Sequence, residues 1–256
     1  MQMISLARCK ALVATGLLVG VGLVSPAAAA ITAGNHLSAQ FGANGGTTAA
    51  MSTSGATLIV LVASELVSGT PCTPSDSQTN TYTGLTAQAN ASETRVRLWY
   101  VAAPSTSGTH TFTCAGTNHY PTVTVMAFNG VAASPFDQQN GAQSDNGALT
   151  TLATGSVTPT EDNELVVTGI AVGNSAFGGT PTVSGYTVAE FMNYQGGTAV
   201  GGALAYVIQT TATATDPTWV WTNGGRPAAA VATFKAAAAG GSTCTGGLTL
   251  LGAGKC

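Results

Sequence analysis

The sequence repeats part of itself at a spacing of 106 residues, and this repeat constrains the fold more than any single motif does. Residues 98–128 align without a gap on residues 204–234, and seven of the 31 aligned positions are identical. The identical pairs are Leu98/Leu204, Tyr100/Tyr206, Val101/Val207, Thr109/Thr215, Pro121/Pro227, Val125/Val231 and Phe128/Phe234. Because most of these residues are apolar or aromatic, the repeat indicates a shared scaffold. We expect any specific activity to lie where the two halves differ.

The first 30 residues have the pattern of a secretory signal peptide. Arg8 and Lys10 precede an uncharged apolar run of 14 residues, 11–24, and small residues then lead to Ala30. The apolar run is short of the roughly 20 residues that a membrane-spanning helix needs. We therefore expect cleavage near Ala30 and an exported bacterial protein, extracellular or periplasmic, with no membrane segment after cleavage.

The remainder of the chain carries very little charge. Only 7% of the sequence is charged, whereas about a quarter is usual for globular proteins. Beyond residue 30 the positive residues are Arg95, Arg97, Arg226, Lys235 and Lys255. Without clustered Lys and Arg, a nucleic-acid partner is not expected. A surface of Thr, Ser, Asn, Gln and Gly is typical of extracellular wall or matrix proteins.

Four cysteines follow the signal segment, and an even number in an exported chain predicts two disulfides. Proximity favours Cys72–Cys114 and Cys244–Cys256, although four cysteines allow three connectivities. The histidines His36, His110 and His119 have no metal-ligand spacing. We expect neither a metal nor a cofactor.

Short strands separated by turn residues dominate the chain, and helical periodicity is absent. Residues 57–67 form a near-continuous apolar run, which predicts a strand covered on both faces. The other expected strands are 95–102, 109–114, 122–128, 165–172, 203–208, 218–222 and 228–234. We predict an all-β, jelly-roll-like β-sandwich built from two pseudo-repeated halves; two tandem sandwiches are the alternative. The expected organisation is a signal peptide (1–30), a β-sandwich domain (31–238), and a small-residue linker with a disulfide-closed tail (239–256).

Two segments resemble a group of exported bacterial β-sandwich proteins. The first segment, 76–82, reads Asp-Ser-Gln-Thr-Asn-Thr-Tyr, where the group has Asp-Ser-x-Gly-Asn-x-Tyr. The second, 123–131, has Ala127 where the group has glutamate in a Glu-Phe-Ser-Gly motif. The resemblance covers about residues 55–235 and implies a β-sandwich. It carries no activity and no catalytic residue across.

Two sets of side chains are candidates for ligand binding. Arg95, Arg97 and Trp99 alternate along one expected strand and therefore share a face, which would suit a sugar ring and its hydroxyls. Val96, Leu98 and Tyr100 take the other face of this strand, which we assign to the core. Trp219 and Trp221 also share a face, with side chains roughly 7 Å apart. The alternatives are a solvated cation–π stripe for the first set and core packing for the second.

The sequence supports catalytic residues less well than ligand-binding residues. The carboxylates Glu65, Asp76, Asp137 and Glu190 could serve a glycosidase, but no motif pairs them at the required separation. The alternative for these residues is loop capping and surface charge. A calcium site at Asp76, Asn80 or Asp137 is a further alternative that no known spacing supports.

The sequence therefore predicts a secreted, non-catalytic surface or matrix protein that binds polysaccharide or a cell-surface glycan. One alternative is a self-assembling coat or filament protein that associates through the C-terminal tail. Another is a glycoside hydrolase or lyase on a β-sandwich scaffold.

Overall fold

The structure is a computed structural model that describes residues 29–173, 177–193 and 200–239. Every regular element in these ranges is a β-strand, so the all-β prediction is confirmed. No helix in the described residues is long and apolar enough to span a membrane. The strands are β1 (Thr32–Gln40), β2 (Gly45–Thr47), β3 (Leu58–Leu66), β4 (Thr73–Asp76), β5 (Thr83–Gly84), β6 (Gln88–Ala89), β7 (Thr94–Ala102), β8 (Phe112–Ala115), β9 (Thr122–Asn129), β10 (Val131–Gln143), β11 (Leu149–Ala153), β12 (Glu164–Gly173), β13 (Thr182–Val183), β14 (Thr187–Met192), β15 (Val200–Gln209) and β16 (Thr218–Ala236).

Two large antiparallel sheets form the centre of the molecule. The first sheet has the order β1-β9-β3-β7-β5, with β6 also paired to β7, and the second has the order β10-β16-β12-β15-β14. Their facing sides bury one apolar cluster, which contains Val60, Leu98 and Phe128 from the first sheet and Val167 and Phe234 from the second. The β-sandwich prediction is therefore confirmed.

The jelly-roll form of the prediction is not confirmed. Each large sheet takes all its strands from one half of the chain, β1 to β9 for the first sheet and β10 to β16 for the second. The two halves do not interleave, because the chain completes one large sheet before it begins the other.

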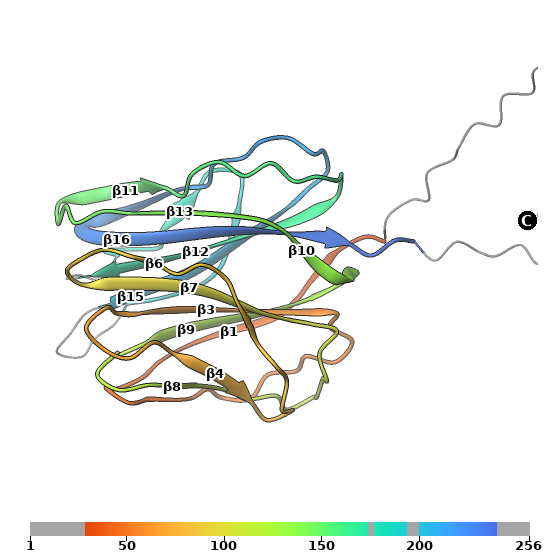
Figure 1. Ribbon diagram of the computed structural model, residues 1–256, viewed down its shortest axis with the longest axis horizontal. Coiled ribbons are helices and arrows are strands. Elements are labelled where there is room, and N and C mark those ends of the chain that lie inside the picture. The colour runs from red at the N-terminus through yellow and green to blue at the C-terminus, as the bar shows by residue number, and fades with distance from the viewer. Residues whose placement is uncertain (1–28, 174–176, 194–199, 240–256) are drawn as a thin grey trace, which may run out of the picture.

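Each large sheet is covered on its outer side by a small cap. The first cap is the sheet β2-β8-β4, and the second consists of β11, β13 and the first part of β16. Phe112 of the first cap and Trp219 of the second are fully buried against the sheets beneath them. Figure 1 shows the resulting four layers, from β11 and β13 at the top to β4 and β8 at the bottom. The covering explains why β3 and β12 are buried along their whole length, as the apolar run 57–67 predicts for β3.

The pseudo-repeat of the two halves is not confirmed as a whole, but two strands that contain aligned residues lie in similar places. β7 and β15 both lie between a central strand and a short edge strand, and β15 begins 106 residues after β7. The repeated aromatic residues connect the sheets: Tyr100 packs edge-on against Phe234 at 5.4 Å, and Tyr206 against Phe128 at 5.5 Å. These two pairs lie at two seams, where an edge of one sheet meets an edge of the other. We call the meeting of β5, β6 and β7 with β10 the first seam, and the meeting of β1 with β14 the second seam.

The structure tests two further predictions, one about a disulfide and one about the ends of two strands. Cys72 and Cys114 form the expected disulfide, which ties the chain before β4 to β8. Cys244 and Cys256 lie outside the described residues. The prediction of two separate strands at 218–222 and 228–234 is wrong, because β16 continues through residues 223–227 from the second cap into the second sheet.

Candidate functional site

The tryptophan pair predicted to bind sugar lies inside the molecule. Trp219 is fully buried and Trp221 is 5% exposed, and both belong to the apolar cluster between the second sheet and its cap. The indole N–H of Trp219 donates to the hydroxyl of Thr168 at 2.9 Å. The prediction that these two residues bind a ligand is therefore wrong. Their alternation is real, but the shared face is the inner face of the cap.

The first predicted set, Arg95, Arg97 and Trp99, does share one face of β7, as expected. The side chain of Arg95 has a structural role, because its Nε donates a hydrogen bond to the buried carboxylate of Glu65 at 2.8 Å. Arg97 lies over the ring of Trp99 at 4.1 Å and donates from Nε to the carbonyl oxygen of Leu85. Arg97 and Trp99 are only half-buried, and their binding of sugar stays a prediction.

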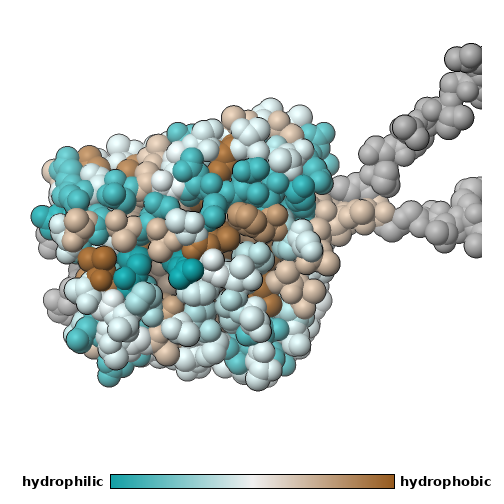
Figure 2. Space-filling view, viewed as in Figure 1, coloured by the Kyte–Doolittle hydropathy of each residue, from teal (hydrophilic) through white to brown (hydrophobic). Residues whose placement is uncertain are grey.

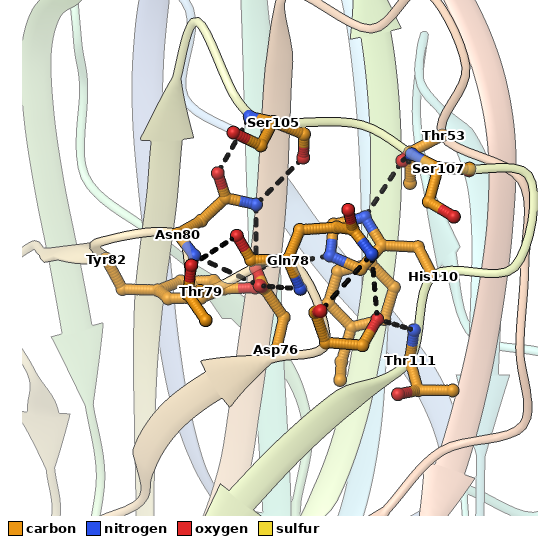
Figure 3. Close-up of polar contacts among 12 residues, drawn as sticks. Thr53, Asp76, Gln78, Thr79, Asn80, Tyr82, Ser105, Ser107, His110 and Thr111 are labelled. Carbon is orange, nitrogen blue, oxygen red and sulfur yellow. Dashed lines mark hydrogen bonds and ion pairs between the residues drawn. The ribbon is translucent and has the colours of Figure 1, made fainter.

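Asp76 is the centre of a polar cluster that holds three loops together (Figure 3). One carboxylate oxygen accepts hydrogen bonds from the backbone N–H groups of Gln78 and Asn80, and the other from the Tyr82 hydroxyl at 2.9 Å. Burial opposes ionisation, but the hydrogen bonds from Asn80, Tyr82 and Gln78 outweigh it and lower the pKa of Asp76. A carboxylate with this many donors is a structural anchor.

The same cluster explains the motif 76–82. Thr79 has a backbone φ of 59°, in the left-handed region, where the resembling proteins have glycine. The side-chain amide of Asn80 donates to Asp76 and to the carbonyl oxygen of Ser105. The motif therefore builds a loop and its anchor, and both carboxylate oxygens of Asp76 accept hydrogen bonds within it.

Two histidine–carboxylate pairs are also buried. His110 contacts Asp76 at 3.3 Å through Nε2 and Thr53 at 2.8 Å through Nδ1, and His119 contacts Glu65 at 2.7 Å. The side chains of His110, Asp76, His119 and Glu65 are all at most 1% exposed. The Thr53–His110–Asp76 series is similar in composition to a hydrolytic triad, but no substrate can reach it.

The other two candidate carboxylates are also engaged in contacts within the protein, Asp137 with its side chain 7% exposed and Glu190 with its side chain 24% exposed. The carboxylate of Asp137 accepts hydrogen bonds from the backbone N–H and the hydroxyl of Thr160, and its Oδ1 lies 3.8 Å from Nζ of Lys235. Glu190 joins the two sheets at the second seam, where it binds Nδ1 of His36 at 2.8 Å and the hydroxyl of Ser38 at 2.7 Å. No group of three or more His, Cys, Asp or Glu in the described part of the chain is placed to hold a metal ion.

The two seams differ, and the difference creates a groove. At the second seam, β1 has a single extra residue opposite β9 between Ala33 and His36, and the Glu190 contacts then join β1 to β14. At the first seam, β10 makes a larger excursion, because five steps from Val131 to Phe136 lie opposite two steps of β16. Pro135 lies in this excursion and offers no N–H to a neighbouring strand. β-Bulges of this kind bend a strand and re-aim its side chains.

The excursion forms one wall of an open groove of about 400 Å³. The groove is lined by Thr81, Thr83, Tyr100, Ala102, Ala133, Ser134, Pro135 and Phe136. Phe136 is 36% exposed, and its ring lies parallel to that of Tyr100 with centroids 6.2 Å apart. Figure 2 shows brown, apolar surface along the middle of the visible face, where β7 and β10 lie in Figure 1. The groove thus combines two aromatic rings with exposed hydroxyl groups.

Beyond the groove the first seam is closed. The side chain of Gln139 accepts a hydrogen bond from the backbone of Thr86 at 2.9 Å, and Asp145 binds the backbone of Ala91 and the hydroxyl of Ser92. The groove is therefore a local opening with fixed walls.

The sequence interpretation missed this groove. It assigned Tyr100 to the core, where one side of the ring does pack, and it gave no role to Phe136. One signal was present: Ser134-Pro135-Phe136 puts a proline beside an aromatic residue. Proline in a sheet is confined to edges and bulges, so an adjacent aromatic residue is a candidate for exposure.

Comparisons with known proteins do not identify the chain: no family model, no curated protein and no solved structure matches it.

Proposed function

We propose that the chain is an exported polysaccharide-binding protein and that the groove at the first seam is its binding site. The observation that carries the proposal is the parallel pair Tyr100 and Phe136 in an open groove with hydroxyl-bearing walls. The C–H face of a pyranose ring packs on an aromatic ring, and its hydroxyls pair with side-chain hydroxyls. Thr81, Thr83 and Ser134 supply such groups.

The size and construction of the groove support the proposal. A volume of about 400 Å³ lies in the range of small-molecule sites. Tyr100 is anchored from behind by Phe234, and the walls are fixed by β7 and by the contacts of Gln139. A site with fixed walls loses little conformational freedom on binding.

Export is part of the proposal. The disulfide Cys72–Cys114 fits an oxidising compartment, either extracellular or periplasmic. The N-terminal pattern of residues 1–30 points in the same direction.

The hydrolase alternative receives less support. A glycosidase needs two carboxyl groups beside the scissile bond, and the groove lining contains no Asp or Glu. The assembly alternative depends on residues 239–256, which lie almost wholly outside the described residues.

The test is retention of the full chain on insoluble polysaccharides. We expect Phe136→Ala to weaken binding about tenfold, the equivalent of about 1.4 kcal/mol for one lost aromatic contact. Val220→Ala is the matched control, because Val220 is the other exposed large apolar side chain and lies on the second cap. Equal retention of the wild type and Phe136→Ala would contradict the site, and retention on no polysaccharide would contradict the function.

A further inference from the structure

The groove lining contains no Asp, Glu, Lys, Arg or His. Its polar groups are the hydroxyls of Thr81, Thr83, Ser134 and Tyr100, and the rest of the wall is Ala102, Ala133, Pro135 and Phe136. A charged ligand group that enters the groove therefore leaves water without meeting an opposite charge. That transfer is costly unless the group is paired.

The charged side chains next to the groove in sequence are engaged elsewhere. Arg97 projects from the opposite face of β7 to Tyr100, where it lies over Trp99 and binds the Leu85 carbonyl. Asp137 follows Phe136, but its carboxylate binds Thr160 and lies near Lys235. Neither side chain is directed to the groove, so neither can pair with a ligand charge there.

The hydroxyl-bearing wall is exposed along the groove. Thr81, Thr83 and Ser134 are all exposed, and they come from the two sides of the seam, β5 with the residues before it and β10. Exposed rims leave the groove accessible to a polymer from solvent. The stacked rings of Tyr100 and Phe136 form the aromatic part of its lining.

We infer that the groove binds an uncharged polysaccharide, with a pyranose face on Phe136 and ring hydroxyls on Thr83 and Ser134. This inference rests on the proposed function and narrows its ligand class. We expect uronic-acid polymers to bind more weakly, because the groove lining offers their carboxylates no cation. Selectivity then comes from unpaired charge in the wrong ligand as well as from stacking with the right one.

The experiment compares binding of the full chain to neutral polysaccharides (a β-glucan, a xylan and a mannan) and to two polyuronates (pectate and alginate). The variants are Phe136→Ala, Ser134→Lys and the control Val220→Ala. We expect the wild type to bind at least one neutral polymer more tightly than either polyuronate, and Phe136→Ala to bind that polymer about tenfold more weakly. Ser134→Lys should gain binding to polyuronates, because it supplies the missing cation at the groove wall.

The outcomes separate the two claims. Binding to polyuronates alone, still weakened by Phe136→Ala, would overturn the uncharged-ligand inference and leave the proposed function standing. Binding to a neutral polymer that Phe136→Ala does not weaken would overturn the groove as the site.

Discussion

Thr79 shows the effect of one residue on the loop that it occupies. A β-branched residue in the left-handed region is strained by roughly 1–2 kcal/mol, whereas glycine adopts this conformation freely. We expect Thr79→Gly to raise the free energy of unfolding by about 1 kcal/mol in denaturant titrations. The control is Thr81→Gly, since Thr81 is not among the residues with positive φ and its replacement should lower stability. A loss of stability in Thr79→Gly would contradict this explanation of the motif.

Glu164 makes stability depend on pH. It is fully buried, burial raises its pKa, and the nearby charge of Asp137 raises it further. A carboxyl group with a raised pKa in the folded state favours folding at low pH, and this contribution is lost as the pH rises through its folded-state pKa. Glu164→Gln keeps the shape without the charge, so its stability advantage over the wild type should be largest near pH 8 and should shrink as the pH falls towards 4.

The measurement for Glu164 is the midpoint of urea unfolding across that pH range. Glu161→Gln is the control, because the Glu161 side chain is 56% exposed and its contact with Lys235 lies at the surface. An advantage of Glu164→Gln that does not change with pH would show that the buried charge is not its source.

At the scale of elements, the contacts between edge strands decide which seam is open. The Glu190 contacts join β14 to β1 across the second seam, and their side chains are partly exposed. Partly exposed ion pairs contribute little to global stability, usually below about 1 kcal/mol. We therefore expect Glu190→Ala to leave the unfolding midpoint nearly unchanged but to speed amide hydrogen exchange in the outer residues of β14 and β1.

Hydrogen-exchange mass spectrometry checks the role of Glu190, with Glu161→Ala as the control at a surface ion pair outside the seams. Unchanged exchange in β14 and β1 would mean that apolar contacts alone hold the second seam. Faster exchange in β10 instead would mean that the two seams are coupled through the core.

At the scale of the whole molecule, hydrophobic patterning predicted the layers better than the site. The continuous run 57–67 identified a strand with both faces covered, and alternation placed Val96 and Leu98 towards the core. Alternation could not say which outer faces carry caps, because a cap is a long-range pairing of β11, β13 and β16. The predicted position of Trp219 was wrong for this reason. Its side chain belongs to the cap, and the second sheet packs against that face of the cap and buries it.

The groove was beyond sequence reasoning for a related reason. It depends on the register of β10 against β16, because β10 advances by five residues from Val131 to Phe136 while β16 advances by only two, from Ala236 to Phe234. Strand alternation assumes a constant register, so a bulge changes which side chains are exposed without changing the composition. Tyr100 and Tyr206, which the sequence alignment pairs, each pack edge-on against a phenylalanine of the other sheet.

The ends of the sandwich are hydrogen-bonded to each other, and this has a consequence for connectivity. The backbone N–H of Ala29 donates to the carbonyl oxygen of Ala237 at 2.7 Å, and that of Ala237 to Gly130 at 2.8 Å. Gly130, at a φ of 75°, is the single residue between the last strand of the first sheet and the first strand of the second. A circular permutant that joins Ala237 to Ala29 and opens the chain after Gly130 would keep every strand pairing. The folded sandwich therefore does not require that the first sheet precede the second in the chain.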